Sequence, residues 1–564
     1  MILSKYTSTL VGLQSSYEFC IIYSVNLLRN GVYKFMKKTF LKILSTLLVT
    51  VSLSVGMPSF AAMNNGIWIN DLKTLFTRNQ AIILAINIRS FNAVDKNGND
   101  IIEPDKGEIP GNFVNAIGRL DEIASQGINT IHLLPITPVG KVKAMGTAGS
   151  LYAISDFTKL NPQLDDPSND LTVEQEAKKF INECHKRNIR VIVDLPSCGS
   201  YDLYLSNPNL FVTGADGKPV VPADWTDVRL FKVTNPDGSL NDELFIQYKK
   251  FVDLVQRIGA DGIRADVATS KTFDFWQKLI SYARGNDPQF LFLAEASESW
   301  SQPVAPNAPF TPYYKLLEAG FDGWYGSFFD FKDWKTQDKF EKQLSLIKTI
   351  KKEFDAKNQP KAVIGSFATH DEMSPIITGG MPFADMIIWL QATLPVNSYF
   401  VDGFQSGDSY QYQYANQKAA KTYTDDDYYY VHKGKFDIFN FSRKPGSVNK
   451  RLLADFGIAN KFKIMASEII DKGDLCFLKT NNAHIFAYMI NYRFSSILVV
   501  INKDLVYNNS VSVPVKGLKE TDIIVPLAFT TTPGIEKGKI NVDLRPGEAT
   551  VFMISRGGAA NKKN

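Results

Sequence analysis

The sequence is poor in cysteine and histidine, with four cysteines and five histidines among 564 residues. Cys20 precedes a predicted cleavage site, and the remaining Cys184, Cys198 and Cys476 are odd in number and widely spaced. A disulfide framework uses an even set of cysteines, and a zinc site needs clustered Cys and His. We therefore predict neither.

A basic tract and a glycine-rich phosphate turn are also missing. The 62 basic and 58 acidic residues are interspersed and give a formal net charge of +4. Without a cluster of positive charge, nucleic acid is not an expected partner. No Gly-rich turn follows the first apolar segment, so the dinucleotide-binding type of open sheet is disfavoured.

The N-terminal region carries an export signal at 36–61. Lys37 and Lys38 precede a short apolar stretch dotted with Ser and Thr, and Ser59 and Ala61 offer small residues for cleavage. A membrane anchor is the alternative, but the apolar stretch is short for a span. We expect a secreted or periplasmic protein with no membrane span after signal removal. Residues 1–35 are expected to be an upstream extension from a wrongly assigned start codon.

Apolar segments of strand length alternate with helical patterns through most of the chain. Continuous apolar runs are typical of strands buried on both faces, hence parallel, and eight β-then-α repeats favour a closed barrel over an open doubly wound sheet. The predicted class is α/β, a (β/α)8 TIM barrel over 70–472. The strand candidates are 81–88, 130–136, 189–196, 262–268, 289–297, 323–329, 362–372 and 396–404.

Two regions depart from this pattern. Residues 197–242 are polar and rich in Gly and Pro, which indicates a subdomain inserted after the third strand. Over 473–556, short apolar segments are separated by polar turns with no helical pattern between them. This arrangement predicts a C-terminal antiparallel β-sandwich.

Three predicted strand ends carry carboxylates, Asp266, Glu295 and Asp371. Strand ends converge at the C-terminal mouth of such a barrel, where carboxylates are costly to bury unless they are partnered or functional. Arg264 and Asp266 lie two apart and face the same side, so we expect the guanidinium to lower the pKa of Asp266. Apolar and acidic neighbours should raise that of Glu295. A nucleophile with a low pKa beside an acid with a raised pKa suits glycoside hydrolysis with retention of configuration.

The segments "GIRADVA", "FLAEAS" and "FATHDE", in this order, resemble three short signatures of the α-amylase family of glycoside hydrolases. The resemblance covers the barrel, the insert and the sandwich. It implies that Asp266 is the nucleophile, Glu295 the general acid/base and Asp371 the third carboxylate. It further implies that Arg264 and His370 contact the substrate. "LYAISDFTKLNP" resembles the segment after strand two, which implies that Tyr152 stacks on the sugar.

One signature is incomplete. "VIVDLPSCGS" keeps Asp194 but has Cys198 and Gly199 where the family has Asn and His. The family's Asn often holds calcium and its His binds the substrate, so their absence puts the usual calcium site and ordinary starch hydrolysis in question.

A separate calcium site is predicted after the first strand. "DKNGNDIIE" places oxygen ligands at alternating positions around a Gly-containing turn, which suits a hard cation. The alternative is an Asx-rich turn with no ion. The candidate ligands are Asp95, Asn97, Asn99, the Ile101 carbonyl and Glu103.

The resemblance implies an exported retaining α-glycosidase that acts on α-glucans or oligosaccharides through a covalent glycosyl–Asp266 intermediate. Two alternatives stay open. The first is a transglycosylase of the same family, which the missing His motivates. The second is a carbohydrate-binding relative without turnover, which would be expected to have a broken carboxylate set.

Overall fold

The computed structural model describes residues 63–64, 67–99, 102–144, 150–222, 225, 227–306, 308–409, 448–528 and 533–556. The chain divides into two units, Met1–Asn64 and Asn65–Asn564. Of the first unit only β1 (Met63–Asn64) is described, so the predicted extension and signal peptide lie outside the described residues. All that follows concerns the second unit.

A closed barrel of eight parallel strands forms the centre of this unit, in the order β10-β11-β12-β3-β4-β5-β8-β9. The pairing of β12 with β3 closes the sheet, so the barrel prediction is confirmed and the open sheet is wrong. Every strand residue is buried, as expected for continuous apolar runs covered on both faces. The strands are β3 (Ile82–Ile86), β4 (Thr130–Leu133), β5 (Arg190–Leu195), β8 (Gly262–Ala265), β9 (Leu291–Ala294), β10 (Gly323–Trp324), β11 (Ala362–Gly365) and β12 (Asn397–Val401).

Helices lie between the strands in the chain, and α7 shows how one is built. In α7, the Thr172 and Gln175 side chains form a capping box, and Phe180 and Ile181 face the barrel core. The helices are α3 (Leu72–Thr77), α4 (Ile88–Phe91), α5 (Phe113–Ala116), α6 (Leu120–Ser125), α7 (Val173–Lys186), α9 (Asp242–Arg257), α10 (Phe273–Asn286), α11 (Tyr313–Ala319), α12 (Gln337–Asp355), α13 (Pro375–Thr393), α16 (Lys450–Met465) and α17 (Ser467–Lys472). Short 3-10 turns are η1 (Pro104–Lys106), η2 (Ile117–Arg119), η3 (Pro162–Leu164), η5 (Ala268–Ser270), η6 (Phe328–Asp333) and η7 (Phe404–Ser406), and β2 (Ile67–Trp68) precedes α3.

The insert after β5 has its own small structure. Its two strands pair antiparallel, and a helix and a 3-10 turn lie between them in the chain. This is the subdomain that the Gly- and Pro-rich composition indicated. Its elements are β6 (Cys198–Ser200), α8 (Tyr201–Ser206), η4 (Pro208–Leu210) and β7 (Val228–Leu230).

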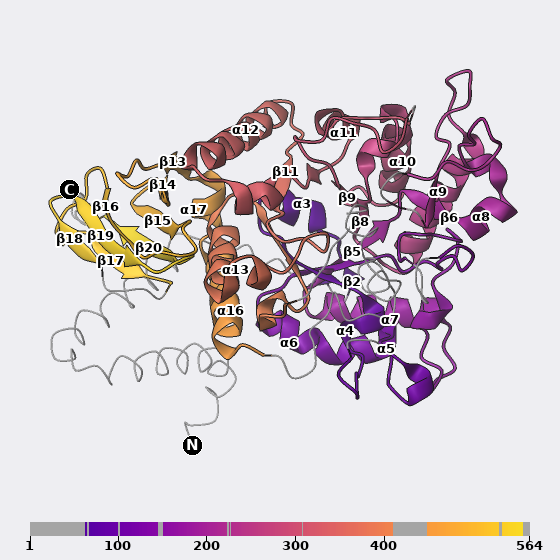
Figure 1. The fold of residues 1–564 in the computed structure, drawn as a ribbon, viewed down its shortest axis with the longest axis horizontal. Coiled ribbons are helices and arrows are strands. Elements are labelled where there is room, and N and C mark those ends of the chain that lie inside the picture. The colour runs from indigo at the N-terminus through magenta and orange to yellow at the C-terminus, as the bar shows by residue number, and fades with distance from the viewer. Residues whose placement is uncertain are drawn as a thin grey trace. The chain divides into compact units, whose positions relative to one another are not determined.

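Two antiparallel sheets follow α17, drawn in yellow in Figure 1 beside α13 and α16. Their contact with the barrel helices includes buried hydrogen bonds, such as Thr393 Oγ1 to Tyr488 Oη at 2.6 Å. The predicted antiparallel C-terminal part of the fold is confirmed. One sheet contains β13 (Asp474–Phe477), β14 (Ile485–Tyr492), β15 (Ser495–Asn502), β20 (Ala549–Ser555) and β17 (Ile523–Pro526); the other contains β16 (Asn509–Pro514), β19 (Lys539–Leu544) and β18 (Gly534–Glu536).

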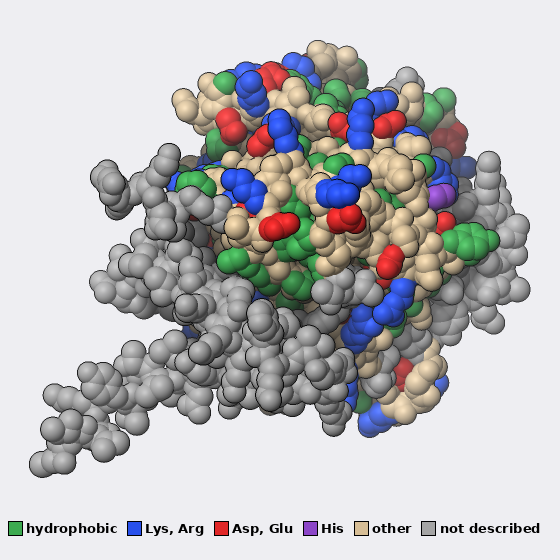
Figure 2. Space-filling view, turned by 90° about the vertical axis from the view of Figure 1, so that its left-hand side faces the viewer, with side chains coloured by type: hydrophobic (Ala, Val, Ile, Leu, Met, Phe, Trp, Pro, Cys, Tyr) green, Lys and Arg blue, Asp and Glu red, His purple; other side chains and the backbone are tan. Residues whose placement is uncertain are grey.

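The described surface carries mixed charge. On the face shown in Figure 2, basic and acidic side chains are interspersed with polar and apolar ones. Among the described residues, no helix is both long and apolar enough to cross a membrane.

Candidate active site

Arg264, on β8, lies at the centre of the candidate site and is fully buried. Its Nη1 contacts both carboxylate oxygens of Asp194 at 2.8 and 2.9 Å and Oδ1 of Asp266 at 3.1 Å. Its Nη2 lies 2.9 Å from Oε2 of Glu295. One guanidinium therefore holds carboxyl groups from the ends of β5, β8 and β9 around a single point.

Asp266 is the first residue after β8 and is held from two sides. Oδ1 faces Arg264, while Oδ2 accepts hydrogen bonds from the Ser197 main-chain N–H at 3.0 Å and hydroxyl at 2.7 Å. Burial raises the pKa of Asp266 to about 7, although Arg264 acts to lower it. The expectation of a lowered pKa is therefore wrong, because desolvation outweighs the guanidinium in this buried position.

Glu295 follows β9 and points at the same arginine. Its Oε2 also accepts the main-chain N–H of Val267 at 2.6 Å. Val267 has φ 35°, a left-handed conformation that is unfavourable for a β-branched residue. This strained turn directs the N–H onto Glu295, so a charged donor and a main-chain donor both contact Oε2.

Asp371 and His370 lie in the loop that follows β11. His370 is fully buried, and its Nε2 is 3.7 Å from Oδ1 of Asp371. Burial, followed by repulsion from Glu295, raises the pKa of Asp371 well above its ordinary value. The third carboxylate is thus electrostatically linked to the other two.

Tyr152 joins the two halves of the site. Its hydroxyl donates to Oδ2 of Asp194 at 2.8 Å and lies 2.7 Å from Nε2 of His370. Its ring is parallel to that of His370, with an interplanar angle of 7°. The structure therefore brings together the six predicted residues, namely Asp266, Glu295, Asp371, Arg264, His370 and Tyr152.

Sequence reasoning missed several polar residues of this cluster. His132 on β4 and Tyr399 on β12 lie in strands that the apolar runs predicted, and no motif singled them out. Tyr325, whose hydroxyl accepts from Nε of Arg264 at 3.0 Å, follows β10. Ser197 lies between β5 and β6, and only the structure shows its contact with Asp266.

The place of the missing His is filled by the insert. A Cβ atom on Gly199 would lie 2.7 Å from the ring of Phe211 and 2.8 Å from that of Phe231, so there is no room for a side chain. Next to it a cleft opens on Asp266. The cleft is lined by Ser150, Tyr152, Ser197, Cys198, Trp225, Asp227, Val228, Asp266 and Val267.

The predicted calcium loop is satisfied by its own hydrogen bonds. Oδ1 of Asp95 accepts the main-chain N–H groups of Asn97 and Gly98, and the amide groups of Asn97 and Asn99 donate to Oε2 of Glu103. The Lys106 ammonium lies 2.5 Å from Oε1 of Glu103. The predicted side chains therefore converge, but the Lys106 ammonium already contacts Glu103. Ile101 lies outside the described residues.

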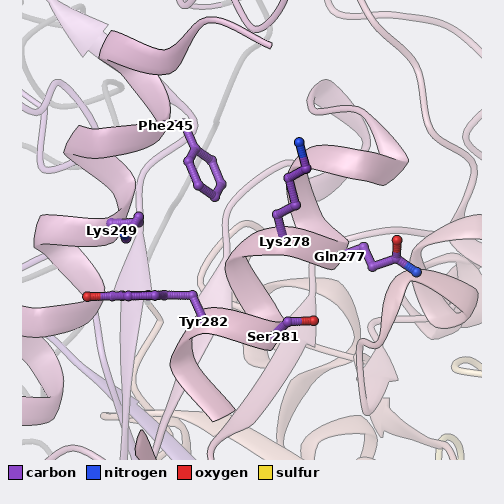
Figure 3. A pocket seen from close by; sticks show the side chains of 6 residues that line it. All are labelled: Phe245, Lys249, Gln277, Lys278, Ser281 and Tyr282. Atoms are coloured by element: carbon purple, nitrogen blue, oxygen red, sulfur yellow. The ribbon is translucent and has the colours of Figure 1, made fainter. Parts of the chain in front are cut away.

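A larger groove of about 570 Å³ lies away from these carboxylates, between α9 and α10 (Figure 3). The ammonium of Lys249 lies 4.2 Å from the centre of the Tyr282 ring there. Its lining contains no carboxylate, so it lacks the groups that the barrel mouth brings together. The lining residues are Phe245, Lys249, Gln277, Lys278, Ser281 and Tyr282.

The closed barrel, the insert after β5 and the two C-terminal sheets define a protein with the α-amylase type of fold. Searched against protein-family profiles, the chain has no match. The crystal structure of a maltogenic α-amylase, AmyB, from Thermotoga neapolitana is similar, with a TM-score of 0.59 and 19% identity. The likeness covers 85% of this chain and 99% of that one.

Two curated relatives match a smaller part of the chain. An alpha-1,4-glucan:maltose-1-phosphate maltosyltransferase from Bifidobacterium animalis subsp. lactis is 26% identical over 211 residues, which are 34% of this chain and 27% of the relative. A cyclomaltodextrinase from a Bacillus species is 23% identical over 226 residues, 36% of this chain and 38% of the relative. The chain thus spans about a quarter to two-fifths of their lengths. Together the comparisons confirm the resemblance to the α-amylase family.

Proposed function

We propose that this chain is a retaining α-glycosidase of the α-amylase family that hydrolyses α-glucosidic bonds in glucans or oligosaccharides. The observation that carries the proposal is the contact of one buried guanidinium with both Asp266 and Glu295. Two carboxyl groups on the same guanidinium face a common point, as a nucleophile and an acid must around one glycosidic bond. Asp371 and His370 lie beside them.

The proposed reaction has two steps. Glu295 gives its proton to the glycosidic oxygen while Asp266 attacks the anomeric carbon, so the leaving sugar departs as an alcohol and a glycosyl ester forms. Glu295, now ionised, then takes a proton from water, whose oxygen displaces Asp266. Before the attack, Arg264 and Ser197 hold the two oxygens of Asp266. Two displacements at one carbon leave the α configuration unchanged.

Hydrolysis of maltooligosaccharides is the direct test. We expect products shorter than the substrate, released first as α-anomers in a proton NMR time course. Release of β-anomers would contradict the double displacement. No cleavage of α-1,4, α-1,6 or sucrose-like substrates would contradict the proposed activity.

Transfer to a sugar hydroxyl is the second candidate. Two observations favour it, the maltosyltransferase relative and the packing of Phe211 and Phe231 against Gly199. A different set of side chains near the nucleophile changes which acceptor can reach the glycosyl ester. The same experiment separates the two reactions, since products longer than the substrate indicate transfer.

Calcium binding in the loop after β3 is proposed from its oxygen-bearing side chains. Ca²⁺ would take the place of the Lys106 ammonium beside Glu103, with Asp95, Asn97 and Asn99 as further ligands. We expect millimolar Ca²⁺ to raise the melting temperature relative to EGTA, and Glu103→Gln to remove the difference. A melting temperature that does not respond to Ca²⁺ would refute the site.

Export is proposed from the segment 36–61 alone. N-terminal sequencing of protein recovered outside the cytoplasm should begin near Ala62 or Met63. Recovery of the uncleaved chain in the cytoplasm would contradict export.

A further inference from the structure

A buried lysine that the proposed mechanism does not use lies close to the nucleophile. Lys271 directly follows η5, in the turn that begins at Asp266, and it is almost inaccessible to solvent. Its Nζ donates to the main-chain oxygen of Ser197 at 2.9 Å and to the Ser270 hydroxyl at 3.1 Å. A buried ammonium is costly to desolvate, and near a reacting carboxyl group it is a candidate for function.

Ser197 lies between this lysine and the nucleophile. Its carbonyl oxygen accepts from Lys271, while its main-chain N–H and its hydroxyl donate to Oδ2 of Asp266 at 3.0 and 2.7 Å. One residue is thus held by an ammonium at its carbonyl and by a carboxyl group at its two donors. Since Arg264 contacts Oδ1, the donors on the second oxygen of the nucleophile come from Ser197.

Side chains hold the two-residue link between β5 and β6. The Tyr248 hydroxyl donates to the Pro196 carbonyl oxygen at 3.1 Å, and Lys271 holds the next carbonyl, that of Ser197. Lys271 is itself fixed at its main chain, whose carbonyl oxygen accepts from the Thr311 hydroxyl at 2.7 Å. The ammonium therefore sits on a fixed part of the chain, and the link that it holds carries the two Ser197 donors.

The anion that acts on Lys271 is Asp266. Burial lowers the pKa of Lys271 to about 8, while Cys198 and Asp266 act to raise it. Burial raises the pKa of the Cys198 thiol to about 11, so near neutral pH the thiol carries no charge. The ammonium is mostly protonated there, and the carboxylate of Asp266 is the partner whose charge it balances.

The other groups around Asp266 include more negative than positive charge. Arg264 acts to lower the pKa of Asp266, but this guanidinium also contacts Asp194 and Glu295, which act to raise it. Asp371 is a further carboxyl group that interacts with Asp266. The titratable groups that interact with Asp266 and are neutral near pH 7 are Tyr152, Tyr248 and Cys198. A positive charge on the Oδ2 side therefore favours the ionised form that a nucleophile needs.

We infer that Lys271 is a positioning residue of the nucleophile, which keeps the Ser197 donors on Oδ2 of Asp266 and supplies positive charge on that side. The inference rests on the proposed function in one respect, namely that Asp266 is the attacking group. Without the ammonium, the Ser197 carbonyl loses this donor and the carboxylate loses a nearby cation. Both losses favour the protonated form of Asp266, because hydrogen bonds and positive charge stabilise the ionised one.

Lys271→Met removes the ammonium and fills the space with a side chain of similar shape. In the parent, kcat/KM on maltooligosaccharides should fall below a pH of about 7, where Asp266 takes up a proton. In Lys271→Met this acidic limb should move upward by about half a pH unit or more, with kcat at neutral pH lowered about three- to tenfold. A purely structural lysine would change stability and leave the limb in place.

Lys361→Met is the matched control. Lys361 is also buried, and its Nζ donates to the main-chain oxygen of Phe321 at 2.7 Å. Burial lowers its pKa to about 8 as well, and Asp322 acts to raise it. Lys361 therefore repeats the chemistry of Lys271, but it precedes β11, whereas the site lies where the strands end. We expect the acidic limb and kcat to stay as in the parent.

The pKa of Asp266 can also be measured without substrate. The free energy of unfolding of Asp266→Asn minus that of the parent should rise with pH from about 3.8 and level off at the folded-state pKa, about 7. The same difference, measured between Lys271→Met/Asp266→Asn and Lys271→Met, should level off at a higher pH. In the Lys361→Met background it should level off where it does in the parent.

The inference is overturned if the acidic limb or the levelling-off pH is the same in Lys271→Met as in the parent, or if Lys361→Met moves it as far. Lys271→Gln, which has no charge and a shorter reach, takes its place in both measurements should Lys271→Met fail to fold. A protein that cleaves no glucan would refute the proposed function and not the inference, because the unfolding measurement needs no substrate.

Discussion

Replacement of Asp266 by asparagine is expected to abolish glycosidic cleavage, with a loss in kcat on the order of 10⁴-fold or more. An amide cannot form the glycosyl ester, while the shape of the side chain is kept. In the unaltered protein, kcat/KM should fall as the pH drops below about 7, because Asp266 becomes protonated and loses its nucleophilic charge.

The same substitution should stabilise the folded protein at neutral and alkaline pH. The folded-state pKa of Asp266, about 7, lies above the ordinary value of 3.8, so folding favours the protonated form. Its contribution to stability is full below pH 3.8 and is lost as the pH rises through 7. Asparagine never ionises and avoids this loss, which we place at roughly 1–3 kcal/mol between pH 4.5 and 8.

Chemical denaturation of both proteins at pH 4.5 and pH 8 measures this effect. The difference in free energy of unfolding, variant minus parent, should become more positive at pH 8. Asp216→Asn is the control, because that carboxylate is exposed on the insert and should change neither kcat nor the pH trend. A variant that retains activity, or a difference that does not vary with pH, would contradict the assignment.

Replacement of Glu295 by glutamine is expected to lower kcat on glucans by about 10²- to 10⁴-fold. Glutamine has no proton to give the leaving oxygen and cannot activate water. The loss should be smaller with an aryl glycoside whose leaving group is an acidic phenol. That phenolate departs without protonation, so formation of the glycosyl ester does not need the acid.

Glu298→Gln supplies the same chemical change in the same loop. Its carboxylate accepts from Trp324 Nε1 at 2.6 Å and from the Ser327 hydroxyl at 2.7 Å, contacts away from Arg264. We expect its kcat to stay within about threefold of the parent. A Glu295→Gln protein as active as the parent would end the proposal of a glycosidase.

Much of the fold could be read from local pattern. All eight barrel strands lie within segments that apolar runs predicted, although β8 ends at Ala265 and leaves Asp266 on the turn. Burial on both faces requires such runs, so the pattern is strong. Boundaries were less accurate, and the predicted strand 323–329 is reduced to Gly323–Trp324.

The electrostatic prediction for Asp266 failed for an identifiable reason. Sequence spacing indicated that Arg264 lies beside it, which is correct. Spacing gives no measure of desolvation, nor of the sharing of that arginine with Asp194 and Glu295. The net direction of the pKa shift depends on all of these together.

By itself the sequence determined the barrel, the appended sheets and the three carboxylates at strand ends, because these follow from residues near one another in the chain. Tertiary structure alone decided which donors from distant segments reach each carboxylate. Ser197 meets Asp266 across 69 positions, and His132 meets Tyr399 across 267. Barrel closure sets these distances, since it places the ends of strands remote in sequence side by side, and no local pattern encodes which of their side chains meet.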